Sequence, residues 1–339
     1  MTWDLSKTLP SVQRQSGMAL LLVLLVFSVA SALATAMISR QSHDVQRSTN
    51  RFATQQARAY VWGVESVVKS GLYLDWENDP DIDHALEEWA EDRVLPMEDG
   101  SIFVRIQDAQ GKFNLNWLSA ASANREIWQD RFTRLLNQLG LDVELSNSLY
   151  QWFDEESNIE NTYTALVPPY RPAYRPCKHP SELLLVLDVN LETYRLLEPY
   201  ISCLPVASQL NINTASEYVL ASIDDDFARE DAAQVIADRG DTGIDSVEAF
   251  LALEGVAEAA QKKDDEAAWE AEDFTVRSEY FDVFTRVNLG PAGEWLATDE
   301  FSVFRQQSDG KLSIRYRNYS RREPKALPQS SISTTSVSE

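Results

Sequence analysis

The chain has 339 residues, of which 44% are hydrophobic and 24% are charged, and this balance is typical of a globular rather than a disordered protein. Its 53 acidic and 30 basic residues give a net charge of -23 at pH 7, which repels phosphate backbones and argues against a nucleic-acid partner. The sequence contains no GxSxG, HExxH or P-loop motif and its three histidines are scattered, so no enzyme is predicted.

The N-terminal part of the chain predicts one long helix. An uncharged apolar segment from Met18 to Ile38 is long enough to cross a membrane. Residues 39–74 contain no proline, and their apolar residues recur at three- and four-residue spacing, as on an amphipathic helix. The alternative is a secretory signal cleaved at the Ala-x-Ala sites within residues 32–36, which would make the chain a secreted protein, including a secreted enzyme.

The residues before the apolar segment form a short basic leader that ends in Gly17. This leader resembles the class III signal of type IV pilins and type II secretion pseudopilins. The resemblance implies that a membrane peptidase cleaves between Gly17 and Met18 on the cytoplasmic side and methylates the new N-terminus. The fifth mature residue would be Leu22, where most members of the family carry Glu, and this absence is typical of the K-type minor pseudopilin.

The next segments predict the first part of a head domain. Residues 75–100 are acidic and contain proline, which indicates a connector with one short helix near residues 85–92. Residues 101–107 alternate between apolar and polar and predict a strand. The following DAQGKFNLN, residues 108–116, resembles the D-x-x-G-x-F-N-L-N signature of the K-type family.

Strand signals then nearly vanish from 119 to 272, where apolar residues recur at helical spacing, and they return in residues 274–289, 295–306 and 311–318. The predicted fold class is therefore α+β, with a pilin-like α/β head whose antiparallel sheet is interrupted by a large α-helical insertion, which is the K-type architecture. The predicted parts are a leader (1–17), a transmembrane helix (18–38), an amphipathic stalk helix (39–74), the first part of the head (75–111), the inserted α-domain (112–272), the C-terminal strands of the head (273–320) and a disordered tail (321–339).

An acidic loop, WFDEESNIEN at residues 152–161, holds the densest cluster of oxygen ligands. It resembles the K-type segment W-x-D-x-D followed by G-A-E-D-x-Y, which contributes to calcium binding. Asp154 and Glu160 match that segment, while Glu156 and Asn161 replace its other two Asp residues, so the resemblance implies calcium as a cofactor held by these four. The alternative is a loop whose side chains cap turns. The alternating Asp79, Asp81 and Asp83 lack the EF-hand glycine and glutamate, and we expect them in turns and helix caps.

The two cysteines, Cys177 and Cys203, have no CxxC spacing, which excludes a zinc ribbon or a thioredoxin motif. In an oxidising compartment they would form a disulfide, and two buried thiols are the alternative. We predict that they are bonded.

A segment from 210 to 257 resembles the helix-hairpin-helix repeat of DNA-uptake proteins, which bind phosphates through the backbone of a Gly-rich hairpin. Here the first hairpin reads IDDDF at residues 223–227, without glycine and with three carboxylates. A membrane-anchored DNA-uptake or type IV pilus minor subunit is therefore the alternative function.

The function implied by the K-type resemblance is that of a minor pseudopilin at the tip of the type II secretion pseudopilus. Such a subunit initiates and caps assembly for protein export across the outer membrane. The implied partners are the I-, J- and H-type minor pseudopilins, the major pseudopilin, the prepilin peptidase and the inner-membrane assembly platform. The implied location is the bacterial inner membrane, crossed once, with the N-terminus in the cytoplasm and the head in the periplasm.

Overall fold

The computed structural model describes residues 16–260, 269–290 and 295–318, in two compact units, Met1–Gln56 and Ala57–Glu339. The described part of the first unit belongs to helix α1 (Ser16–Asn78). Within the described residues α1 is the one helix that is long and apolar enough to cross a membrane. The single helix predicted from the sequence is therefore present, and it ends four residues beyond the predicted boundary at residue 74.

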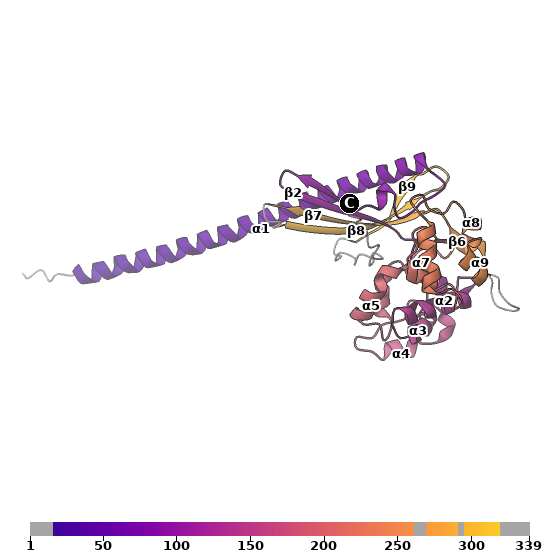
Figure 1. The fold of residues 1–339 in the computed structure, drawn as a ribbon. Helices are drawn as coiled ribbons and strands as arrows, with labels where there is room; N and C mark the ends of the chain where they lie inside the picture. The colour runs from indigo at the N-terminus through magenta and orange to yellow at the C-terminus, as the bar shows by residue number, and fades with distance from the viewer. Residues whose placement is uncertain (1–15, 261–268, 291–294, 319–339) are drawn as a thin grey trace, which may run out of the picture. The chain divides into compact units, whose positions relative to one another are not determined.

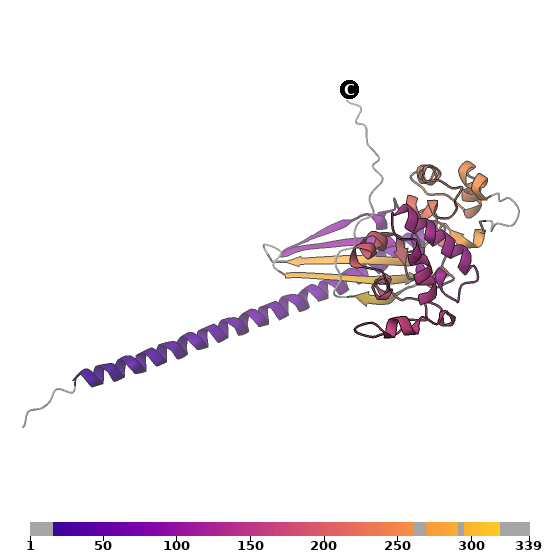
Figure 2. The same cartoon turned by 90° about the horizontal axis from the view of Figure 1, so that it is seen from below.

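The second unit contains a five-stranded antiparallel sheet in the order β1-β2-β7-β8-β9 (Figures 1 and 2). Its strands are β1 (Arg93–Met97), β2 (Gly100–Asp108), β7 (Tyr280–Leu289), β8 (Trp295–Arg305) and β9 (Leu312–Asn318). The C-terminal part of α1 covers one face of this sheet, because its apolar residues recur every three or four positions and share a buried cluster with the strands. The residues of α1 in this cluster are Ala57, Val61, Val64, Val68 and Leu72.

The sheet is interrupted between two strands that are hydrogen-bonded neighbours. β2 pairs with β7, and Asp108 at the end of β2 lies opposite Phe281 near the start of β7. The chain between these strands forms a helical region at that end of the sheet (Figure 1). This arrangement confirms the predicted α+β class with a helical insertion.

The insertion consists of two modules that begin and end in the same way. Each begins with a two-residue strand, β3 (Phe113–Asn114) or β5 (Leu210–Asn211), and each ends with a parallel partner of that strand, β4 (Ile201–Ser202) or β6 (Phe274–Thr275). The helices of the first module are η2 (Leu115–Leu118), α2 (Arg125–Gln138), α3 (Glu144–Trp152), η3 (Glu155–Ser157), α4 (Glu160–Thr164), η4 (Pro180–Leu185), α5 (Leu191–Leu197) and η5 (Glu198–Tyr200). Those of the second are α6 (Glu217–Ala221), α7 (Arg229–Asp238), α8 (Val247–Leu251), α9 (Glu254–Ala260) and η6 (Ala271–Asp273), and both modules contribute to one hydrophobic core.

An Asn-x-Asn turn follows the first strand of each module. Asn114 Oδ1 accepts a hydrogen bond from the Asn116 amide at 3.1 Å, and Asn211 Oδ1 accepts one from the Asn213 amide at 2.9 Å. These side chains replace backbone partners that so short a strand cannot supply. The sequence FNLN and the sequence LNIN therefore perform the same local task.

A disulfide joins Cys177 and Cys203, whose Cα atoms lie 5.6 Å apart. Asn116 fastens the same region, because its Oδ1 accepts from the Cys177 amide at 2.7 Å and its Nδ2 donates to the Cys177 carbonyl at 2.9 Å. The same Nδ2 also donates to the Leu204 carbonyl at 2.7 Å. The disulfide and this asparagine together hold the end of the first module against its beginning.

The predicted strand at residues 274–289 is divided in the structure. Phe274–Thr275 forms β6 and pairs with β5 of the insertion, and the sheet strand β7 begins only at Tyr280. The break occurs at Ser278, between the two strands. Its amide donates a hydrogen bond to the Asp83 side chain, and its hydroxyl donates one to the Asp108 side chain. The predicted connector helix near residues 85–92 is the shorter 3-10 helix η1 (Glu88–Ala90).

Candidate functional sites

The first candidate site is the start of α1. The described helix begins at Ser16, so the Gly17–Met18 junction lies in its first turn, while leader residues 1–15 fall outside the described residues. The large apolar side chains that follow are exposed, for example Met18 at 69% and Leu22 at 61%. A helix that is apolar on all sides and exposed needs lipid or other helices around it. This is the arrangement expected of a membrane anchor.

The second candidate site is the acidic loop, where Asp154 interacts with an arginine. Asp154 Oδ2 accepts a hydrogen bond from Arg125 Nη1 at 2.6 Å, and Oδ1 accepts from the Glu156 amide at 2.9 Å as the N-cap of η3. The hydrogen bond from Arg125 is the main reason why the pKa of Asp154 lies below its ordinary value. Both oxygens of this predicted calcium ligand therefore have protein partners.

The other predicted ligands do not converge on Asp154. Glu160 Oε1 lies 3.0 Å from Arg171 Nε, and the Asn161 carbonyl accepts a hydrogen bond from the amide of Ala165, which caps the C-terminal end of α4. Glu156 is exposed. Calcium takes six to eight oxygens around one point, and the loop as arranged does not supply such a set.

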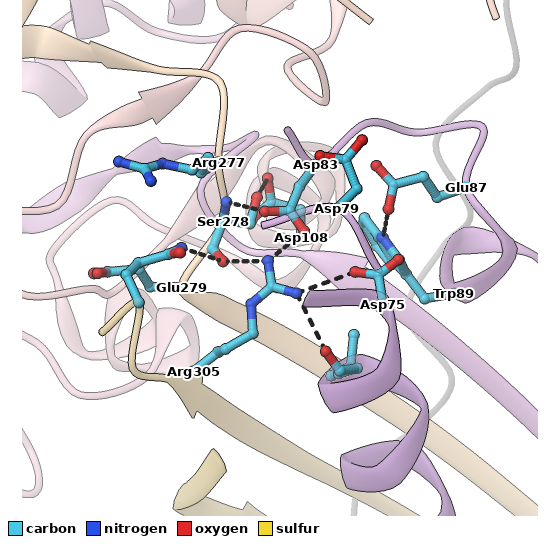
Figure 3. Close-up of polar contacts among 12 residues, drawn as sticks. Asp75, Asp79, Asp83, Glu87, Trp89, Asp108, Arg277, Ser278, Glu279 and Arg305 are labelled. Atoms are coloured by element: carbon cyan, nitrogen blue, oxygen red, sulfur yellow. Dashed lines mark hydrogen bonds and ion pairs between the residues drawn. The ribbon is translucent and has the colours of Figure 1, made fainter. Parts of the chain in front are cut away.

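A different acidic cluster, which we call the polar junction, lies beside the end of α1 (Figure 3). The carboxylates of Asp75, Asp83 and Glu87 have ligand atoms within 4.8 Å of one another, and no other group of three Asp, Glu, His or Cys side chains within the described residues meets this criterion. Asp83, predicted from the sequence to lie in a turn or helix cap, has a buried side chain.

Arg305, at the end of β8, lies at the centre of the polar junction and is 1% exposed. Its Nη1 donates to Asp75 Oδ2 at 3.1 Å, and its Nη2 donates to Asp83 Oδ1 and to the Ser278 carbonyl. The guanidinium also lies 4.8 Å from the centre of the Phe281 ring. A single cation thus connects the last turn of α1, the connector, the segment before β7 and the end of β8.

Asp108, the last residue of β2, extends this network to the insertion. Its Oδ2 accepts hydrogen bonds from Ser278 Oγ at 2.6 Å and from Thr214 Oγ1. Its Oδ1 accepts a hydrogen bond from the Gln110 amide at 2.7 Å. Gly111 packs so closely on Thr214 that a Cβ atom would lie 2.8 Å from its carbonyl carbon. These contacts explain why the D-x-x-G signature needs its aspartate and its glycine.

The polar junction holds more carboxyl groups than cations, and the pKa values of two of its carboxyl groups, Asp83 and Glu87, are raised. Burial raises the pKa of Asp83 to about 6 although Arg305 lowers it, and burial also raises the pKa of Asp108. The pKa of Glu87 rises to about 8 because of burial and because its carboxyl group is hydrogen-bonded to that of Asp75. Neutral pH therefore falls between the pKa values of these groups.

The hairpin that resembles a DNA-binding motif is occupied by protein groups. Arg134 of α2 donates to the Ile223 carbonyl at 3.1 Å and lies 2.9 Å from Asp225 Oδ1. The buried Asp224 accepts a hydrogen bond from Trp269 Nε1 at 3.1 Å. With three carboxylates and an internal arginine at this hairpin, phosphate binding is not favoured.

Comparison with models of known protein families gives two matches, both in the helical insertion. A family model described as type II secretion system (T2SS), protein K matches residues 111–206, and a second model of that description matches residues 210–268. These matches correspond to the two modules of the insertion.

Relatives and a solved structure extend the similarity to the remainder of the chain. Type II secretion system protein K of Pseudomonas aeruginosa is 31% identical over 322 residues, which cover 90% of this chain and 92% of the relative. The protein of the same name from Klebsiella pneumoniae is 32% identical, covering 82% of this chain and 90% of the relative. The solved GspK–GspI–GspJ complex from the type 2 secretion system of enterotoxigenic Escherichia coli contains a chain of the same fold, with a TM-score of 0.69, 24% identity and coverage of 81% of this chain and 100% of that one. With an apolar N-terminal helix, an interrupted pilin-like sheet and a relative matched over nearly its full length, this chain belongs to the type II secretion system protein K family, the K-type minor pseudopilins.

Proposed function

We propose that this chain occupies the tip of the type II secretion pseudopilus, where it initiates and caps the assembly used for protein export. The observation that carries this proposal is Leu22, which lies in the exposed apolar part of α1. A carboxylate within a membrane is costly unless it has a partner. A first subunit has no earlier neighbour whose N-terminal amine could be that partner, so an apolar residue suits this position.

The proposed neighbours are the I- and J-type minor pseudopilins, followed by the H-type and major subunits. Support comes from the solved complex of the same fold, in which GspK is assembled with GspI and GspJ. The chain's own role is binding and mechanical coupling rather than turnover. The inner-membrane assembly platform and the prepilin peptidase complete the proposed set of partners.

The proposed location is the bacterial inner membrane, with a cytoplasmic N-terminus, leader cleavage between Gly17 and Met18, and a periplasmic head. The long apolar helix from Met18 supports membrane anchoring. The cysteine pair supports an oxidising compartment for the head, because disulfides persist in the periplasm and are rare in the cytoplasm.

The tip position is tested by placing a carboxylate in the anchor. We expect Leu22→Glu to reduce the number of pseudopili on cells that overproduce the major pseudopilin, because the new carboxylate has no partner at the first position. Leu22→Ile, the matched control, should leave the number unchanged. Pseudopili as numerous with Leu22→Glu as with the wild type would contradict the tip position, because an internal subunit tolerates this carboxylate.

A further inference from the structure

Arg125, at the start of α2, gathers three acceptors from separate elements around the acidic loop. Its Nε donates to the Leu118 carbonyl at 2.6 Å, its Nη1 donates to Asp154 Oδ2 at 2.6 Å, and its Nη2 donates to the Tyr150 carbonyl. The guanidinium carbon lies 3.3 Å from the centre of the Tyr150 ring, and the side chain is 11% exposed. One cation therefore fastens the end of η2, the last turn of α3 and the cap of η3.

The three acceptors are of the kind that a calcium ion collects. Calcium in proteins is bound by carboxylates and backbone carbonyls, and Arg125 is bonded to one carboxylate and two backbone carbonyls. A guanidinium supplies positive charge and several donors in a fixed plane, and it needs no shell of six to eight oxygens. It can thus close the loop with fewer ligands than the metal requires.

Three backbone carbonyls of the loop accept hydrogen bonds from the loop or from the residues that follow it. The Glu156 carbonyl accepts from Asn158 Nδ2 at 2.7 Å, and Asn158 takes the left-handed conformation with a φ of 56°. The Asn161 carbonyl accepts a hydrogen bond from the Ala165 amide at 3.2 Å, and the Glu160 carbonyl accepts one from Thr164 Oγ1 at 3.0 Å. The loop is therefore closed by turns, a short helix and Arg125.

We infer that Arg125 holds the acidic loop in place of a metal ion, so that this chain folds its first module without calcium. This inference concerns the chain's own residues and does not depend on the tip position. It treats Arg125 as a positioning residue, and Asp154 as its counter-ion rather than as a calcium ligand.

The test uses the full-length chain in detergent and compares its Tm after chelation with EGTA and after addition of millimolar calcium or magnesium. Calcium that bound the folded chain would raise the Tm, and we expect the wild-type Tm to be the same in all three conditions. Arg125→Gln should lower the Tm by about 3–8 °C through the loss of ionic hydrogen bonds. The matched control is Arg171→Gln, because Arg171 pairs with Glu160 on the same loop but its side chain is 79% exposed; its Tm should equal that of the wild type.

The inference is overturned if calcium, but not magnesium, raises the wild-type Tm and Asp154→Ala abolishes that increase. It is also overturned if Arg125→Gln melts at the wild-type temperature. The calcium comparison does not use Arg125→Gln, so the test remains decisive should that variant fail to fold.

Discussion

At the residue scale, the polar junction makes the stability of the head depend on pH. The pKa of Glu87 is raised from its ordinary value of 4.5 to about 8, so the folded chain binds this proton more tightly than the unfolded chain does. The stabilisation from Glu87 is fully present below about pH 4.5 and is lost as the pH rises through about 8. Asp83 acts in the same direction, from 3.8 to about 6. Asp154 has a pKa below its ordinary value of 3.8, so its contribution is complete above that value and does not change as the pH rises further.

We therefore predict that the Tm of the wild type falls as the pH rises from about 4.5 to about 8, and that Glu87→Gln flattens this fall. Glutamine is neutral at every pH and retains an amide that can donate to Asp75. The control is Glu88→Gln, because the neighbouring Glu88 side chain is 96% exposed. Melting curves across this range would contradict the prediction if Glu87→Gln and wild type showed equal slopes.

The residues of this junction illustrate what the sequence does not reveal. Asp83 and Arg305 are 222 positions apart, and no local pattern links them. Aspartates are common in turns and helix caps, so the sequence near residue 80 predicts these roles for its aspartates. Asp108 could be predicted as important, because it opens the D-x-x-G signature, but its partners Thr214 and Ser278 follow only from the fold.

At the element scale, the C-terminal part of α1 packs on the sheet through one apolar stripe. Leu72 is 0% exposed within the cluster that α1 forms with the sheet, whereas Leu74, two residues later, is 54% exposed. We predict that Leu72→Ala lowers the free energy of unfolding by about 2–5 kcal/mol, because it removes buried methyl groups and leaves a cavity. Leu74→Ala should change the free energy by less than about 0.5 kcal/mol.

Urea unfolding of both variants, followed by tryptophan fluorescence, measures this difference. The midpoint for Leu72→Ala should move to lower urea, and the midpoint for Leu74→Ala should remain that of the wild type. Equal shifts in the two variants would mean that α1 is held by something other than this stripe.

The elements differ in how well the sequence predicts them, for physical reasons. The long helix and the strands β2, β8 and β9 were predicted because uninterrupted apolar runs and strict alternation are strong local signals. β1 was missed, since it is short, contains Pro96 and is mostly exposed, as an edge strand allows. The two-residue strands β3 to β6 were also missed, because a pair of residues is too short for any periodicity and each strand is defined by a distant partner.

At the scale of the whole molecule, the proposed cleavage between Gly17 and Met18 would keep the apolar helix on the mature chain. The described residues begin at Ser16, so the interpretation of residues 1–17 as a leader rests on the sequence around Gly17. We predict that Gly17→Val leaves an unprocessed precursor in the inner membrane, because a bulky residue blocks the peptidase. Ser16→Ala is the matched control and should be processed normally.

Mass spectrometry of the membrane-purified chain distinguishes the precursor from the mature form. A Gly17→Val chain of normal mature mass would contradict the leader assignment. Cleavage after Ala34 or Ala36 instead would support the alternative of a secretory signal.

The interruption of the sheet between β2 and β7 also determines the order in which a newly made chain can be completed. Ser278, just before β7, and Asp108, at the end of β2, are separated by 170 residues. Ribosomes add roughly 5–20 residues per second, so β2 waits roughly 10–30 seconds for the strand that pairs with it. During this interval Ile102 and Val104, buried in the finished sheet, belong to a strand with an open edge, and such an edge pairs readily with another chain. A cell that makes this subunit rapidly must therefore shield an incomplete sheet on every nascent chain, and overproduction should be limited by aggregation before it is limited by translation.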